Sequence, residues 1–175
     1  VSCLRAFSRT DDALSVDVDL NEIVDSVLVM LHNRLKKSFE VSKRFGGLPL
    51  IIGNPGKLSQ VVINLMNNAM DAMESAQEQS SVQRITLTTE TCQRDGQSYV
   101  ALHVADTGDG ISEDIQRRIF DPFFTTKPVG QGTGLGLFIC NNLIQEHQGL
   151  LEVASTPGQG ATFSMLLPVT RKESR

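Results

Sequence analysis

Four polar side chains share one face of a segment with the pattern of a long helix. Gln60, Asn64, Asn68 and Asp71 follow one another at spacings of four, four and three, which brings them together on an α-helix. Mg²⁺ prefers oxygen ligands and keeps several waters while it bridges nucleotide phosphates. The amide oxygens of Asn64 and Asn68 could therefore flank such an ion, although a solvated polar face is the more common use of two asparagines taken alone.

A carboxylate stands at the end of an apolar, strand-like run. The sequence DTGDG (residues 106–110) follows residues 99–105, and its glycines would let another group approach the backbone closely. An ionised carboxylate only accepts hydrogen bonds, so Asp106 could select a ring with an exocyclic amine, such as adenine. An acidic turn without a ligand is the alternative interpretation.

A second glycine cluster, GQGTGLG (residues 130–136), precedes a helical pattern. Backbone amides at a glycine-rich helix N-terminus attract phosphate, aided by the helix dipole. The cluster lacks the preceding strand and the later acidic residue of a dinucleotide fingerprint, and no GK[ST] follows as in a Walker A loop. A phosphate site of another kind is indicated.

Between the glycine clusters lies FDPFFTTK (residues 120–127), an aromatic concentration in a chain with only 5% aromatic residues. Phe120, Phe123 and Phe124 could anchor a mobile lid from which Lys127 reaches a phosphate. They could equally belong to the core or to a partner-facing patch. A further segment, TPGQGATF (residues 156–163), predicts a hairpin turn.

The elements that position these motifs follow from periodicity and from capping signals. We predict helices over residues 19–35, 54–76 and 134–148, the first begun by Asp19 and Glu22, the second by Asn54 and Pro55, and the third stopped by Gly149. Strands are predicted over residues 40–45, 50–52, 84–91, 98–105, 150–154 and 161–167. Hairpin connections imply an α+β, two-layer α/β sandwich whose mixed, mostly antiparallel sheet is covered on one face by helices.

Composition excludes several classes. A chain of 175 residues with 40% hydrophobic content can form one core, and its longest apolar runs are too short to span a bilayer. A net charge of −4 without a dense Lys/Arg run argues against nucleic-acid binding. Cys3, Cys92 and Cys140 form no CxxC pair, so neither a disulfide framework nor a zinc site is indicated, and a cytoplasmic location fits best.

Taken in order, five motifs resemble those of the superfamily of gyrase, Hsp90 chaperones, histidine kinases and MutL proteins. NLMNNAMDA resembles the N box, DTGDG the first glycine box, FDPFF the F box, GTGLGL the second glycine box and GQGATF the third. The resemblance extends from about Asp19 to Pro168, and the F box and GTGLGL are most similar to histidine kinases. It implies a Bergerat-type fold that binds ATP and Mg²⁺.

The resemblance also implies roles for individual residues. Asn64 and Asn68 would contact phosphate and Mg²⁺, and Asp106 the adenine amine. Gly108 and Gly110 would line the purine edge, Gly132, Gly134 and Gly136 would contact the phosphates, and Thr162 would act near adenine through water. The implied nucleotide-binding set is completed by Asp71, Ile111, Phe120, Lys127, Thr133, Leu135 and Leu137.

Asn64 and Lys127 are the residues we assign to catalysis. The ATP hydrolases of the superfamily have a glutamate at the position of Asn64, where it activates water as a general base. Because an asparagine cannot accept that proton, the site is suited to phosphoryl transfer to an incoming nucleophile, aided by positioning and metal charge. In histidine kinases the nucleophile is a histidine on a separate helical hairpin, and His32, His103 and His147 lack its motif.

The first residues resemble the end of that hairpin. LRAFSR (residues 4–9) is similar to the second dimerisation helix of nitrogen-sensor-type kinases, and the DA pair at Asp71 and Ala72 and the short lid over residues 125–132 agree. We therefore expect residues 1–15 to end the dimerisation and phosphoacceptor hairpin and residues 16–175 to form the catalytic domain. Expected partners are that hairpin, a response regulator and a second copy in the full-length protein, the isolated domain being monomeric.

Two other functional classes stay open at this point. One is an ATP-gated conformational or hydrolytic protein of the gyrase or MutL kind, which would release phosphate continuously. The other is a degenerate module that binds a regulator without using ATP. Nucleotide binding with Mg²⁺ and the rate of phosphate release distinguish the three.

Overall fold

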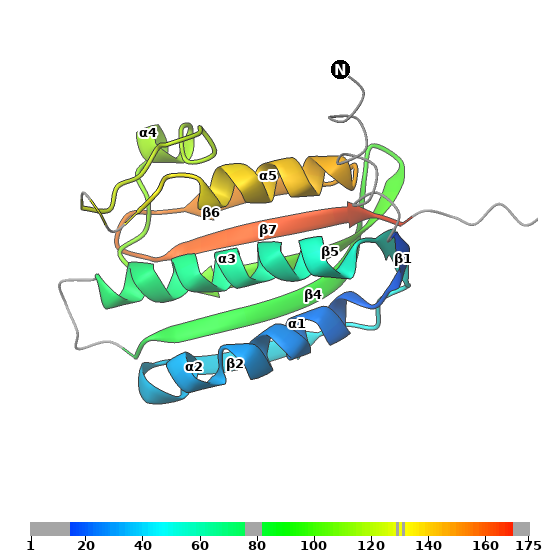
Figure 1. Cartoon of the computed structure of the whole chain (residues 1–175), viewed down its shortest axis with the longest axis horizontal. Helices are drawn as coiled ribbons and strands as arrows, with labels where there is room; N and C mark the ends of the chain where they lie inside the picture. Colours follow the sequence, from blue (N-terminus) through cyan, green and yellow to red (C-terminus); the bar gives the residue numbers. More distant parts are fainter. Residues whose placement is uncertain (1–14, 76–81, 129, 131, 170–175) are drawn as a thin grey trace, which may run out of the picture.

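The computed structural model describes residues 15–75, 82–128, 130 and 132–169, and it has two layers, with the helices in front of a sheet (Figure 1). The strands are β1 (Val16–Val18), β2 (Glu40–Phe45), β3 (Ile51–Gly53), β4 (Arg84–Arg94), β5 (Gln97–Asp106), β6 (Leu150–Ser155) and β7 (Ala161–Pro168). The helices are α1 (Leu20–Met30), α2 (His32–Ser38), α3 (Pro55–Glu74), α4 (Glu113–Gln116) and α5 (Gly136–Glu146).

The main sheet has five strands in the order β2-β4-β5-β7-β6. Its β2–β4 pair is parallel, and the other three pairs are antiparallel. The predicted mixed, mostly antiparallel sheet with helices on one face is thereby confirmed (Figure 1). Asp95 and Gly96 both have positive φ, as a two-residue hairpin turn between β4 and β5 requires.

Helix α3 lies in the middle of the helical layer and contacts both α1 and α5 (Figure 1). Asn54 begins it, because its side chain accepts a hydrogen bond from Lys57 N at 3.1 Å, and Pro55 follows in the first turn. Its apolar face is fully buried at Leu58, Val61 and Leu65, where each side chain contributes about 1.5–3 kcal/mol. This burial fixes the direction of the polar face.

Two predicted helices differ from the structure, one by a break in its middle and one at its ends. The helix predicted over residues 19–35 is two helices, because Leu31 leaves helical geometry between α1 and α2. Helix α5 begins at Gly136 rather than at Gly134, since Gly134 has a φ of 65° and is not helical. At its other end Gln148 takes the left-handed conformation, while a side chain on Gly149 would overlap Leu166 O.

Strand β1 and helix α4 are absent from the sequence prediction. β1 pairs with β3 in a separate two-stranded sheet, and both strands have three residues, too few for a clear period. Of the predicted hairpin end over residues 1–15, residues 1–14 lie outside the described residues. None of the helices in the described part combines the length and apolar character needed to cross a membrane.

Candidate functional site

The predicted motifs meet along α3. A Cβ placed on Gly108 would lie 3.2 Å from Ala72 Cβ, and one placed on Gly136 would lie 3.7 Å from Asn64 Oδ1. The glycine loop after β5 and the start of α5 therefore face the same helix. Asn64 and Ala72 are eight residues apart, which is about 12 Å along a helix axis.

Asp106 is the buried carboxylate of this site, with an exposed fraction of 7%. Its Oδ1 accepts hydrogen bonds from Gly108 N at 2.9 Å and from Ala161 N at 3.3 Å. Burial raises the pKa of Asp106, although these two hydrogen bonds oppose the shift. The carboxylate is thus held in place by backbone and can still accept a hydrogen bond from a ligand.

The first and third glycine motifs pack directly on each other. Gly110 and Gly160 have φ values of 73° and 78°, and a side chain on either would overlap a backbone oxygen, that of Thr156 or of Asp106. Gly158 N also donates to Asp109 O at 2.6 Å. The glycines at 110 and 160 are therefore required for this close approach, whatever else they contact.

A polar clip holds the same loops, and sequence reasoning missed it. Ser155 Oγ accepts from Ile111 N at 2.8 Å and donates to Gly160 O at 2.7 Å. Gln116 Nε2 donates to Ile111 O at 2.8 Å and to Ser155 O at 3.0 Å. Ile111 itself is partly buried against the core. No local sequence signal marks Ser155 or Gln116, because the contacts that tie the two loops together, from Ile111 N to Ser155 and from Gln116 to Ser155, join residues 44 and 39 positions apart.

The register of the sheet moves Thr162 away from the expected place. Thr162 pairs with Ala105 on β5, and successive side chains of a strand point to opposite faces. Asp106 lies on the same face as Val104 and the buried Phe163, so Thr162 is on the other face. The structure does not bring Thr162 to Asp106, and the neighbour on the face of Asp106 is Ala161.

The phosphate side of the candidate site is the start of α5. Its N-cap residue, Leu135, provides no side-chain hydrogen bond, so the amides of the first turn are not capped by a side chain. Thr133 Oγ1 accepts from Leu135 N at 3.3 Å. Gly134 packs on the backbone of Phe123, and Gly132 packs on Thr125 and Lys127. Leu137 lies partly buried against the core.

Asn64 and Asn68 fit a metal that is shared with phosphates. Both are half-buried on α3, and Asn68 makes no side-chain hydrogen bond within the described part of the chain. Among the described residues no group of three or more His, Cys, Asp and Glu side chains could hold a metal alone. Two neutral amide oxygens suit Mg²⁺ when phosphates and waters complete its coordination.

Lys127 and Asp71 form an ion pair within the predicted site. Lys127 Nζ donates to Asp71 Oδ2, and Asp71 Oδ1 accepts from Arg34 Nη2 at 2.6 Å. Sequence reasoning missed Arg34, which lies on α2 and carries no motif. The predicted lysine thus reaches the polar face of α3 at Asp71.

The aromatic residues of the F box divide between two environments. Phe120 packs partly buried against the core, as an anchor would. Phe123 is 74% exposed with a φ of 65°, and the Phe124 ring lies 4.6 Å from the Arg118 guanidinium carbon. The three phenylalanines therefore do not form one buried cluster.

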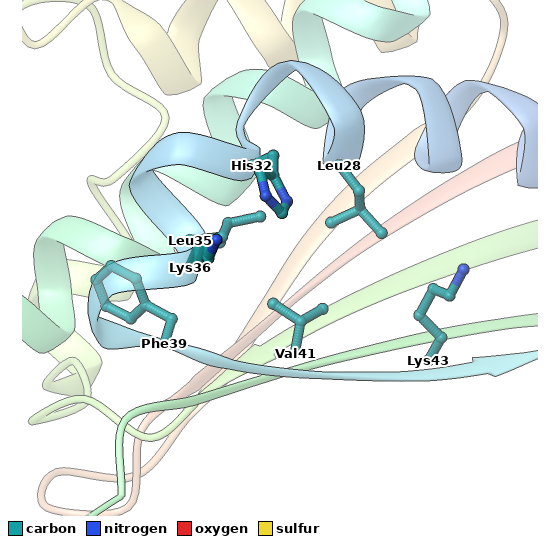
Figure 2. Close-up of a pocket in the computed structure, with 7 residues that line it drawn as sticks. All are labelled: Leu28, His32, Leu35, Lys36, Phe39, Val41 and Lys43. Carbon is teal, nitrogen blue, oxygen red and sulfur yellow. The ribbon is translucent and has the colours of Figure 1, made fainter.

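A hollow of about 330 Å³ opens between α1, α2 and β2, away from this site (Figure 2). Side chains from the helices and from β2 face one another across it (Figure 2). It is lined by Leu28, His32, Leu35, Lys36, Phe39, Val41 and Lys43. Since it contains none of the residues predicted to bind nucleotide, it is not the candidate site.

Comparison with protein families finds a match over the part of the chain that contains the candidate site. The model of the family described as histidine kinase-, DNA gyrase B-, and HSP90-like ATPase matches residues 53–171. The signal transduction histidine-protein kinase AtoS of Escherichia coli K12 is 36% identical over 169 residues, 95% of this chain and 26% of its own length. The sensor kinase CckA of Brucella abortus is 35% identical, over 98% of this chain and 19% of its own length.

Solved structures share the fold. The catalytic domain of histidine kinase ThkA has a TM-score of 0.74 and 28% identity, covering 90% of this chain and 99% of that domain. Full-length ShkA in complex with AMPPNP has a TM-score of 0.73 and 30% identity, with 90% of this chain matching 32% of its length. The chain spans about a quarter or less of the two curated relatives named above.

Proposed function

Since the chain belongs to the histidine kinase-, DNA gyrase B- and HSP90-like ATPase family, as a catalytic domain of sensor histidine kinases, we propose a specific reaction for it. It binds ATP with Mg²⁺ beside α3. It then donates the γ-phosphoryl group to a histidine that lies outside residues 1–175. The convergence of the motifs on one helix carries this proposal.

The base side of the proposed site is built around Asp106. Its buried carboxylate accepts a hydrogen bond from the adenine amine. Gly108, Gly110 and Ile111 shape the loop around the ring. Because Gly108 N and Ala161 N fix Oδ1, the carboxylate needs little reorganisation when adenine binds. Ala72 on α3 lies against Gly108 and so borders the base side of the proposed site.

The phosphate side uses the other end of the polar stripe. Asn64 and Asn68 supply oxygen ligands for Mg²⁺, which would neutralise phosphate charge there. Backbone amides from Gly132 to Gly136 and the Lys127 ammonium contact the phosphates. Asn64 cannot act as a general base, so the site favours transfer to a placed nucleophile over hydrolysis.

The wider setting is part of the proposal. Residues 1–15 end a dimerisation and phosphoacceptor hairpin of the nitrogen-sensor type, and residues 16–175 form the catalytic domain. The hairpin and a response regulator are the partners, and two copies pair through the hairpin in the full-length protein. The domain works in the cytoplasm, on the cytoplasmic side if the whole protein is anchored in a membrane.

The test is the dependence of ATP affinity on Asp106. Asp106→Asn replaces one acceptor oxygen by a donor, so calorimetric titration with ATP and Mg²⁺ should show a loss of about tenfold or more. Asp95→Asn is the matched control, because Asp95 lies in the distant hairpin turn and asparagine tolerates its positive φ. Unchanged affinity in Asp106→Asn would refute the adenine assignment.

A further inference from the structure

The carboxylate of Asp71 is divided between two cations from different elements. Oδ1 accepts from Arg34 on α2, and Oδ2 accepts from Lys127 in the segment before α5. Burial raises the pKa of Asp71, but the hydrogen bonds and charges of Arg34 and Lys127 outweigh it and leave the pKa below its ordinary value. Asp71 is therefore an ionised bridge between α2 and Lys127.

Arg34 holds α3 at three points. Its guanidinium donates to Asn67 Oδ1 at 3.0 Å, to Asp71 Oδ1 at 2.6 Å and to Glu74 Oε2 at 2.9 Å. These acceptors are spaced by four and three residues and form one face of α3. A planar, multiply bonded guanidinium fixes the carboxylate orientation, which a lysine at this position could not do.

Asp71 also belongs to the stripe of Asn64 and Asn68. It therefore lies where two faces of α3 meet, one turned to Arg34 and one turned to the proposed phosphate site. Lys127 has a long, flexible side chain that loses rotamer freedom when it is held in one place. The second oxygen of Asp71 restrains it beside the stripe before any phosphate arrives.

We propose that Arg34 is a positioning residue for the phosphate end of the nucleotide site. By occupying Oδ1 of Asp71, it directs Oδ2 to Lys127 and so holds the ammonium where the phosphates bind. When Arg34 is absent, Asp71 is free to turn or to draw Lys127 onto both of its oxygens. The phosphates then lose a placed cation, while the adenine side at Asp106 is unaffected.

The inference rests on the proposed function and is tested by calorimetric titration of the 175-residue chain with ATP and Mg²⁺. Arg34→Ala should weaken ATP binding about tenfold, as expected for loss of a charge-assisted contact. Arg34→Lys, which keeps a single bond to Asp71, should lie between the wild type and Arg34→Ala. Affinity for adenosine, followed by NMR titration, should stay unchanged.

A double variant tests whether Arg34 acts through Lys127. In Lys127→Ala, adding Arg34→Ala should cause no further loss of ATP affinity, because coupled residues are non-additive. Arg94→Ala is the control, since it breaks another Arg–carboxylate pair, with Glu152, far from α3. Arg94→Ala should leave the affinities for ATP and for adenosine unchanged.

The outcomes separate the two claims. A wild-type chain that does not bind ATP contradicts the proposed function itself. If the wild type binds ATP, then unchanged affinity in Arg34→Ala, additive losses in the double variant, or an equal loss for adenosine overturns the role of Arg34. An equal loss for adenosine would mean that Arg34 merely supports the fold.

Discussion

Asp106 accepts hydrogen bonds at both of its oxygens only when it is ionised, and burial raises its pKa. ATP affinity of the wild type should therefore fall as the pH decreases toward that raised pKa. Titrations at several pH values from neutral to mildly acidic would show this decrease. At each pH the ATP affinity of the wild type is divided by that of Asp106→Asn, because protonation of ATP itself affects both proteins equally and cancels in this ratio. A ratio that does not change with pH would contradict the assignment.

The same shift has a consequence for stability. A raised pKa in the folded state means that Asp106 stabilises the fold below its unfolded pKa and that this contribution is lost as the pH rises through the folded pKa. At neutral pH, therefore, Asp106→Asn should not lower the melting temperature. Loss of ATP binding by this variant is then not a result of unfolding.

Single residues differed in how far the sequence could identify them. Asp106 and Asn64 stand in motifs whose chemistry is visible from local order and spacing. Arg34 and Ser155 act through partners 37 and 44 residues away in the chain, and nothing in their own surroundings in the sequence indicates those partners. Thr162 was predicted near adenine because it lies in a motif, but one step of strand register reverses the face on which it lies.

At the scale of elements, α3 and α5 are joined at their ends away from the site. Asn54 N donates to His147 Nε2 at 3.0 Å, and His147 Nδ1 donates to Leu143 O at 2.7 Å. The imidazole thus links the last turn of α5 to the first turn of α3. A neutral ring with its proton on Nδ1 satisfies both contacts.

Substitution of the side chain of Asn54 or of His147 should destabilise the fold, each for its own reason. Asn54→Ala should cost about 1 kcal/mol as a lost N-cap, and His147→Ala about 1–2 kcal/mol because the Asn54 amide loses its acceptor. Urea unfolding measures both. Ser112→Ala is the control, because Ser112 caps the short α4 without a side-chain hydrogen bond and should change little. Equal effects at all three positions would contradict this account.

Element prediction succeeded where burial is periodic. α3 and the β4–β5 hairpin follow their apolar patterns and turn signals closely. The break at Leu31 could not be seen, since the apolar stripe continues across it and reports burial rather than continuous backbone hydrogen bonds. β1 was missed because three residues carry too little pattern to distinguish a strand from a connector.

At the scale of the whole molecule, the core residues in the described part of the chain run from Val18 to Leu167. A chain that starts at residue 16 should therefore keep its fold and its ATP affinity. We expect a melting temperature within about 2 °C of that of the 175-residue chain, measured by circular dichroism. A larger decrease would show that residues 1–15 belong to the catalytic domain and would move the proposed boundary.

The fate of the γ-phosphoryl group depends on which nucleophile reaches it. A site that positions ATP but lacks a base for water should transfer the group only when a nucleophile is supplied. With radiolabelled ATP, the chain alone should release little phosphate. Addition of a helical hairpin that bears a phosphoacceptor histidine should give an acid-labile label on the hairpin.

Two variants decide between transfer and hydrolysis. Asn64→Ala and Asp106→Asn should each reduce labelling of the hairpin at least about tenfold, because one removes a phosphate-side ligand and the other the adenine contact. Labelling should be abolished when the acceptor histidine is replaced. Sustained phosphate release that needs no hairpin and is unaltered by Asn64→Ala would instead make this catalytic domain a hydrolase. Water would then reach the phosphate by a route that does not involve the polar stripe of α3.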